Sequence, residues 1–238
     1  MKRILRQFDL DLVRASSRQT IMDFLTDRKI DLVLDVGANE GQFARSLRAS
    51  HYQGWIRSFE PIASVAQVLA TSAAGDPKWD VETFALGATA ERAAINVSDS
   101  TVFSSLRDTT DAAERFSEQA AVHRTEEIEV RTLDDVVPTM PANTLLKIDT
   151  QGFEKQVLDG ARRTLPALKG VLMELPIIQL YHGNWKFHEA VEYMDRAGFV
   201  PAQIHPVNFH WRDKVSLVEV DCLFRPKNEE VDANLRAH

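Results

Sequence analysis

The chain has 238 residues, of which 44% are hydrophobic and 26% are charged, and its formal net charge is −7. This length and composition predict one α/β domain with a full core. A net negative charge argues against a nucleic-acid surface, which needs a basic face. The single cysteine, Cys222, excludes an intramolecular disulfide framework.

The chain has no continuous apolar run long enough to cross a membrane, and residues 1–10 have no apolar signal core. We therefore expect a cytoplasmic protein without a membrane span. We divide it into a leading helix over 1–29, a core over 30–225 and a loose tail over 226–238. The helix is predicted because apolar residues from Leu10 to Leu25 recur on one helical face.

The first strand ends in a glycine turn. Residues 31–35 form a short apolar run that ends in Asp35, Gly37 and Gly41 bracket a turn, and a helix begins at Gln42. In an open α/β sheet, ligands bind where a strand's carboxyl end meets the following helix. Glycine lets the backbone approach a ligand closely, and the helix start offers free N–H groups. The predicted ligand contacts of this turn are Asp35, Gly37, Ala38, Asn39, Gly41 and Phe43.

The spacing of the turn narrows the ligand. A dinucleotide fingerprint has three glycines and suits a pyrophosphate. Here an acid precedes the first of two glycines, as Asp35-Val-Gly-Ala-Asn-Glu-Gly41. This pattern resembles the first motif of methyltransferases that use S-adenosylmethionine (AdoMet). An acid at this place suits the positive charges of that cofactor and would repel a pyrophosphate.

A second acid supports an adenosine cofactor. Glu60 follows a predicted strand over 54–59, and Pro61 ends that strand. An acid about 20 residues beyond the glycine turn can accept hydrogen bonds from both ribose hydroxyls. We therefore predict that Glu60 and Pro61 contact the cofactor, although a surface glutamate before a proline would look the same.

The middle of the chain alternates helix and strand signals. A helix is predicted around residues 65–69 and a third strand over 79–86, whose last residues Ala85 and Leu86 would face the adenine. Residues 93–97 look like a short strand. Residues 108–127 have few large apolar groups and are predicted to form an exposed helix or a mobile insert that covers the substrate. Thr132 begins a short helix with a capping pattern.

The later part of the chain carries the catalytic candidates. A fourth strand over 145–148 ends at Asp149, and a fifth over 170–175 ends at Glu174. His182 lies in a loop over 176–186. A helix over 187–197 and two final strands over 199–204 and 216–224 follow, with a loop that carries His205 and His210.

The catalytic candidates are Asp149, His182 and Glu174. Asp149 could act as a base, hold a substrate hydroxyl or cap the next helix. His182 could be the base because it follows the fifth strand, and Glu174 could be a substrate-side acid or a plain strand end. Glu154 fits the first turn of a helix, where the dipole favours an acid. The sequence has no local His and Asp cluster for a metal, so we expect none to be required.

Four segments together resemble the FkbM family of AdoMet-dependent methyltransferases. They are 35–41, Phe59-Glu-Pro61, Thr132-Leu-Asp-Asp135 and Lys147-Ile-Asp-Thr-Gln-Gly-Phe-Glu154. Many family members have Glu where this chain has Gln151. The resemblance implies a Rossmann-like, class I methyltransferase fold, with a seven-stranded, mostly parallel sheet, an antiparallel last strand and helices on both faces. It also implies methylation of a hydroxyl on a sugar or a polyketide-like small molecule.

Two other functions remain open at this point. An NAD-dependent oxidoreductase could have the same general fold, although the absent third glycine and Asp35 count against it. A non-catalytic AdoMet-binding protein would have the same turn without chemistry. The sequence does not indicate the oligomeric state.

Overall fold

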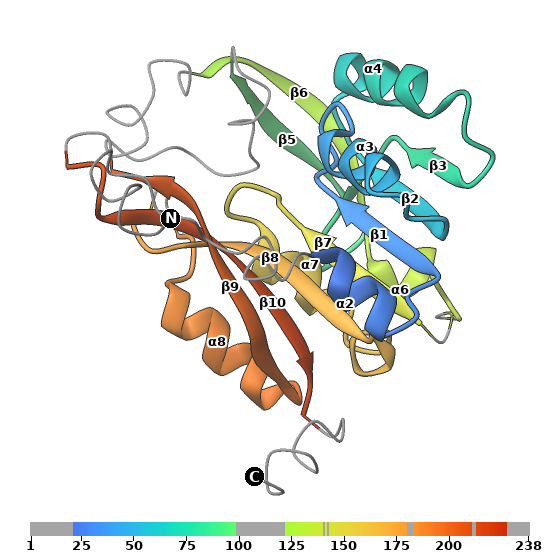
Figure 1. The fold of residues 1–238 in the computed structure, drawn as a ribbon. Coiled ribbons are helices and arrows are strands. Elements are labelled where there is room, and N and C mark those ends of the chain that lie inside the picture. Colours follow the sequence, from blue (N-terminus) through green and yellow to red (C-terminus); the bar gives the residue numbers. More distant parts are fainter. Residues whose placement is uncertain are drawn as a thin grey trace, which may run out of the picture.

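The computed structural model describes residues 21–98, 122–139, 141, 143–179, 183–210 and 213–227. A seven-stranded sheet with the order β3-β2-β1-β7-β8-β10-β9 runs through it (Figure 1). Its strands are β1 (Leu32–Val36), β2 (Trp55–Phe59), β3 (Trp79–Glu82), β7 (Thr144–Ile148), β8 (Gly170–Pro176), β9 (Phe199–Phe209) and β10 (Leu217–Pro226). Within this sheet, the neighbouring strands β3, β2, β1, β7 and β8 pair in parallel. β10 pairs antiparallel with both of its neighbours, β8 and β9. The predicted seven-stranded sheet with an antiparallel last strand is confirmed.

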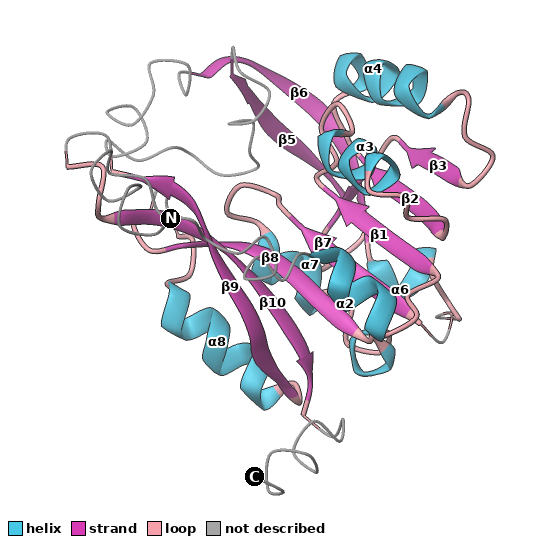
Figure 2. Ribbon diagram, viewed as in Figure 1, coloured by secondary structure: helices cyan, strands magenta, loops and turns pink. Residues whose placement is uncertain are grey.

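Helices cover both faces of this sheet, as predicted (Figure 2). One face packs against α2 (Ile21–Asp27), α3 (Gln42–Ala49) and α4 (Ala63–Ala73). The other packs against α6 (Leu133–Val136), α7 (Glu154–Asp159) and α8 (Phe187–Arg196), with a 3-10 turn at Leu165–Ala167. Strand side chains alternate between the faces, so Val33 packs on the first face and Leu34 on the second.

The predicted strand over 79–86 is wrong, because the chain forms two strands there in two different sheets. β3 ends at Glu82, and β4 (Ala85–Leu86) belongs to a three-stranded sheet with β6 (Val122–Arg131) and β5 (Glu91–Ser98), in the order β4-β6-β5. Between the two strands, the ring of Phe84 packs 5.7 Å from that of Phe59. The burial of Phe84 turns the chain away from the large sheet.

The exposed helix or mobile insert predicted over 108–127 is wrong for residues 122–127, which lie in β6. They pair antiparallel with β5, and the side chains of Arg92 and Glu127 form an ion pair of 2.6 Å across the two strands. The charged composition of this segment reflects a strand with an exposed face. Residues 108–121 lie outside the described part of the chain.

Several element ends also differ from prediction. The described part of the leading helix ends at Asp27, and residues 9–20 lie outside the described residues. β8 continues past Glu174 to Pro176, and β9 continues to Phe209, so His205 lies in a strand and not in a loop. β10 pairs with β9 along this whole length, and that pairing extends the strand. Residues 228–238 of the predicted tail lie outside the described residues, and the division into helix, core and tail stays a prediction.

Candidate functional site

The glycine turn between β1 and α3 is held against two neighbouring strands. The backbone N–H groups of Gly37 and Ala38 both donate to the carbonyl of Phe59 at the end of β2, at 3.1 Å. Gly37 has φ +72, and a Cβ there would lie 1.9 Å from the carbonyl oxygen of Asp149. Only glycine fits this position without moving β7. The turn is therefore fixed between the carboxyl ends of β2 and β7.

Glu60 clamps the same turn from the end of β2. Its carboxylate is 6% exposed, and it accepts one hydrogen bond from the N–H of Asn39 and one from that of Ile62, both at 3.0 Å. Burial raises the pKa of Glu60 to about 7, although both hydrogen bonds favour the ionised form. The carboxylate has further lone pairs, so it can hold the turn and also accept from ligand hydroxyls.

Asp35 is buried, and the ammonium of Lys147 neutralises the charge of its carboxylate. Asp35 is 0% exposed, and its Oδ1 lies 3.1 Å from Nζ of Lys147 on β7. The same ammonium donates to the carbonyl of Gly37 at 3.1 Å and lies 3.5 Å from Oδ2 of Asp149. Burial opposes the charge of Lys147, but Asp35 and Asp149 outweigh burial and raise the pKa of Lys147 above its ordinary value. Lys147 was not predicted as a site residue.

These side chains belong to a row of polar residues on one face of the sheet. β1 and β2 place Asp35 beside Ser58, β1 and β7 place it beside Lys147, and β8 and β10 place Glu174 beside Asp221. Each residue stands on the face that α2, α3 and α4 cover, at a position where strand alternation would put an apolar side chain. We call this set the polar row; its members are Ser58, Asp35, Lys147, Glu174 and Asp221.

A cavity of about 300 Å³ lies between the glycine turn and this row. That volume is at the lower end of the range for small-molecule sites. The ring of Phe43 covers the cavity side of Lys147, whose ammonium lies 5.6 Å from the ring centre. The lining residues are Gly37, Ala38, Asn39, Gln42, Phe43, Lys147, Ile148, Asp149, Leu172, Glu174 and Asp221.

The cavity brings together six of the predicted site residues and leaves the others outside its lining. Those that line it are Gly37, Ala38, Asn39, Phe43, Asp149 and Glu174. Gly41 packs under the turn, where a Cβ would meet Leu69 and Trp79. Ala85 and Leu86 are buried in the second sheet. His182 lies outside the described residues.

The remaining predicted contacts, Asp35, Glu60 and Pro61, lie behind or beside the turn, and their roles toward a cofactor stay predictions. The lining residues that were not predicted are Gln42, Lys147, Ile148, Leu172 and Asp221. A polar residue inside an apolar strand was the available signal for Lys147 and Asp221.

Acids gather where β7, β8 and β10 meet the cavity. Burial, and then the charge of Asp149, raises the pKa of Glu174 to about 10, and the same two causes raise the pKa of Asp221 to about 6. Burial also raises the pKa of Glu219, which accepts a hydrogen bond of 2.8 Å from the amide of Asn208. Within the described residues, no group of three His, Cys, Asp or Glu side chains is arranged to hold a metal ion.

The sequence predicted Glu154 in the first turn of a helix but did not predict its contacts with the preceding turn. It begins α7, and its Oε1 accepts from the N–H of Thr150 at 3.2 Å and of Gly152 at 3.0 Å. Burial raises the pKa of Glu154 to about 7. The residue thus fixes the turn that follows Asp149.

The chain was compared with known proteins. A sequence model of the methyltransferase FkbM domain matches residues 35–201. No curated protein matches the chain. Among solved structures, the chain is similar to magnesium protoporphyrin IX methyltransferase from Synechocystis PCC 6803, with 9% identity, a TM-score of 0.48 and coverage of 94% of this chain and 89% of the other.

Two further structures show likeness at the same level. A TehB-like AdoMet-dependent methyltransferase from Corynebacterium glutamicum has 12% identity, a TM-score of 0.44 and coverage of 94% of both chains. An rRNA methylase from Streptococcus thermophilus has 9% identity, a TM-score of 0.48 and coverage of 91% of this chain and 99% of the other. At these values the likeness carries no argument about the acceptor.

The family match and the site agree. The matched range includes the glycine turn, Glu60 and Asp149, and a cavity of small-molecule size lies beside Gly37. The match rejects the NAD-dependent oxidoreductase alternative. The chain belongs to the FkbM methyltransferase family and is an AdoMet-dependent methyltransferase.

Proposed function

We propose that the protein transfers a methyl group to a hydroxyl of a small molecule or a glycan, such as a sugar or a polyketide-like compound. The observation that carries this proposal is the position of Asp149. It follows β7 directly, lines the cavity beside the glycine turn and keeps a side chain that is 31% exposed. An acid that borders both the cavity and solvent can reach an acceptor hydroxyl.

The bound cofactor supplies a methyl group on a positive sulfonium, so the protein mainly has to align the acceptor and manage one proton. Asp149 is oriented by two neighbours: the amide of Gln151 donates to its Oδ1 at 2.7 Å, and Lys147 lies 3.5 Å from its Oδ2. We propose that Asp149 accepts the hydrogen of the acceptor hydroxyl, either as base or as the group that holds it.

Glu174 has a different proposed role. Because burial raises its pKa to about 10, its carboxyl holds a proton at neutral pH. A protonated carboxyl cannot take the proton of the acceptor hydroxyl, so we propose that Glu174 helps to hold the acceptor and does not act as the base. His182 stays the alternative base.

A small acceptor is also favoured over nucleic acid by charge. The chain carries a net charge of −7, and the carboxylates of Asp149 and Asp221 line the cavity. Phosphates would be repelled there. In the described residues, no helix is both long and apolar enough to span a bilayer. We further propose that the enzyme acts in the cytoplasm.

Asp149→Asn tests the proposal. Wild type and variant are incubated with isotope-labelled AdoMet and a pool of sugars, glycans and polyketide-like alcohols, and products are read by mass spectrometry. We expect O-methylated products, and we expect the variant's turnover to fall by about 10²–10⁴-fold with a change in S-adenosylhomocysteine affinity of under about threefold. Asp80→Asn, in an exposed position on β3, is the matched control. Methylation at nitrogen or carbon only, or equal turnover in Asp149→Asn, would contradict the proposal.

A further inference from the structure

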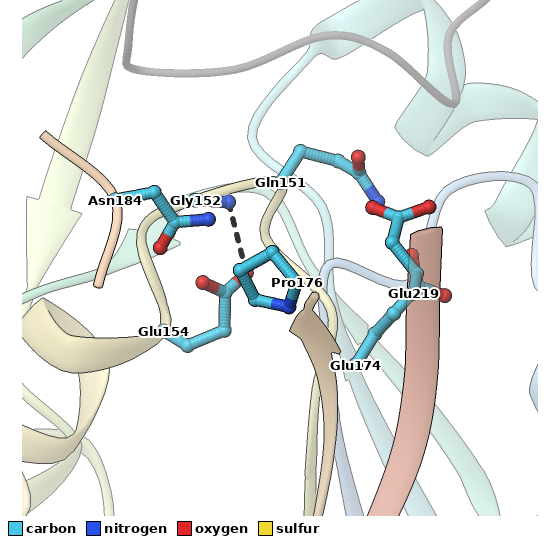
Figure 3. Close-up of a pocket in the computed structure, with 7 residues that line it drawn as sticks. All are labelled: Gln151, Gly152, Glu154, Glu174, Pro176, Asn184 and Glu219. Carbon is cyan, nitrogen blue, oxygen red and sulfur yellow. Dashed lines mark hydrogen bonds between the residues drawn. The ribbon is translucent and has the colours of Figure 1, made fainter. Parts of the chain in front are cut away.

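A small recess lies next to the cofactor cavity and shares Glu174 with it. It has a volume of about 10 Å³ and lies between the turn after β7, the carboxyl end of β8 and the start of β10. Figure 3 shows Glu154 and Asn184 on one side of the recess and Gln151, Glu174 and Glu219 on the other. Gln151, whose amide donates to Asp149, lines the recess, so the recess lies next to Asp149.

Two buried oxygen atoms in this recess accept no hydrogen bond within the described part of the chain. They are Oε2 of Glu154, a residue that is 2% exposed, and Oδ1 of Asn184, a residue that is 7% exposed. The other oxygen of Glu154 is fully engaged by the turn at Thr150 and Gly152. Buried acceptors of this kind are normally paired, so a group that enters the recess should bring hydrogen-bond donors.

None of the described residues that line the recess is positively charged. Glu154, Glu174 and Glu219 line it, and the charges of Asp149 and Asp221 act on Glu174 from the adjoining strands. Among the described residues, Lys147 is the cation whose charge lowers the pKa of Glu174. Its ammonium is already bonded to Asp35 and to the carbonyl of Gly37. The surrounding carboxyls therefore favour a donor that also carries a positive charge.

We propose that this recess receives a protonated primary amine of the methyl acceptor, so that the acceptor is an amino alcohol, such as an amino sugar, and not an anionic or phosphorylated compound. This inference rests on the proposed function, because it names the class of hydroxyl compound that the enzyme methylates. A primary ammonium has three donors, and Glu154 Oε2, Asn184 Oδ1 and the Glu174–Glu219 pair offer acceptors on both sides of it.

The size of the recess agrees with this occupant. A volume of about 10–15 Å³ accommodates one water-sized group, and an ammonium group has about that size. A quaternary ammonium is larger and has no N–H. A hydroxyl alone would fit the space but would not offset the negative charges that Asp149, Glu219 and Asp221 place around Glu174.

Ethanolamine is the smallest probe that joins a hydroxyl to a primary ammonium. Its affinity is measured by isothermal titration, in the presence of S-adenosylhomocysteine, against ethylene glycol, which has the same length without the charge. Tetramethylammonium chloride at equal ionic strength controls for charge without donors. We expect ethanolamine to bind at least about tenfold more tightly than either, a difference of about 1.4 kcal/mol.

Variants that remove one charge test whether Glu174 and Glu219 cause the preference for ethanolamine. Glu174→Gln and Glu219→Gln keep the shape of the side chain, and each should reduce the ethanolamine preference by about tenfold. Glu192→Gln, at an exposed ion pair with Arg196 on α8, should leave the preference unchanged. An unfolding midpoint in urea that matches wild type shows that each variant is folded.

A second signature is proton release. In the recess without the amine, burial and then the charges of Asp149, Glu219 and Asp221 raise the pKa of Glu174 against the opposing charge of Lys147, so its carboxyl holds a proton. Because an entering ammonium favours the ionised carboxylate, a proton should leave. Titrations at about pH 8 in two buffers of different ionisation heat should show this release in wild type and not in Glu174→Gln.

Four results would overturn the inference: equal binding of ethanolamine and ethylene glycol, equal binding of tetramethylammonium, no loss in the two glutamine variants, or displacement of ethanolamine by millimolar magnesium chloride. Each readout is independent of catalysis. A protein that binds ethanolamine as expected but methylates no hydroxyl would contradict the proposed function alone. O-methylation of neutral alcohols without any ammonium preference would contradict this inference alone.

Discussion

Lys147→Met should destabilise the protein more than any exposed charge substitution, because it leaves the buried carboxylate of Asp35 without its cationic partner. Two unit charges 3.1 Å apart attract by about 5 kcal/mol at an effective dielectric constant of about 20. The variant also loses the hydrogen bond from Lys147 to the carbonyl of Gly37. Removal of one partner of a buried pair costs about 3–5 kcal/mol. With a urea slope of about 2–3 kcal/mol/M, the unfolding midpoint should fall by about 1–2 M.

The matched control is Lys155→Met, which breaks an exposed Lys–Asp pair with Asp159 on α7. Such pairs contribute about 0–1 kcal/mol. The double variant Asp35→Asn/Lys147→Met should recover about 2 kcal/mol of the loss, because no buried charge remains. If Lys147→Met lost less than about 1 kcal/mol and the double variant recovered nothing, the two side chains would not form a stabilising pair, and the account of the polar row would be wrong.

Three further predictions concern the turn and the buried acids. Glu60→Ala should weaken S-adenosylhomocysteine binding in calorimetry by about 1.5–3 kcal/mol for each charge-assisted hydrogen bond lost; an unchanged Kd would remove Glu60 from the cofactor site. Gly37→Ala should abolish cofactor binding and lower the thermal midpoint, because a Cβ would lie 1.9 Å from the Asp149 carbonyl; a wild-type midpoint would contradict this. The folded-state pKa of Glu154, about 7, exceeds the ordinary value of 4.5, so about 3 kcal/mol of stability that is present below pH 4.5 should be lost as the pH rises from about 4.5 to about 7. Urea unfolding at several pH values should show that loss in wild type and a flatter profile in Glu154→Gln.

The parts of the fold that the sequence predicted well are those with a strong local signal. The run before Asp35, the glycines at 37 and 41 and the amphipathic start at Gln42 each specify their own structure. The same is true of Thr132, whose side chain accepts from the N–H of Asp135 as the capping pattern predicts. The seven-stranded, mostly parallel sheet with an antiparallel last strand was implied by the family resemblance.

The errors arose where long-range pairing decides the structure. Residues 79–86 have one continuous strand-like pattern, but the partner of Ala85 is Val130 and not β2. Nothing local distinguishes a strand that stays in one sheet from one that changes sheets. His205 belongs to β9 because Asp221 pairs with it across the sheet, a contact that no local pattern contains.

The site was predicted in part for a related reason. Asp149 and Glu174 were recognised because they follow apolar runs at the ends of strands. Lys147 was passed over because it stands inside the run Leu145–Ile148, where its charge looks like an exposed strand face. Its ammonium is buried because Asp35 lies beside it on β1. A polar residue inside an otherwise apolar central strand is the signal that would have indicated the polar row.

The central claim is that the turn from Gly37 to Gly41, together with Glu60, holds the adenosyl cofactor. A crystal structure of the protein with S-adenosylhomocysteine tests it most directly. We expect the ribose hydroxyls within hydrogen-bond distance of the Glu60 carboxylate and the amino-acid end in the cavity beside Lys147 and Asp149. Density for the ligand elsewhere, with this cavity free of it, would contradict the account.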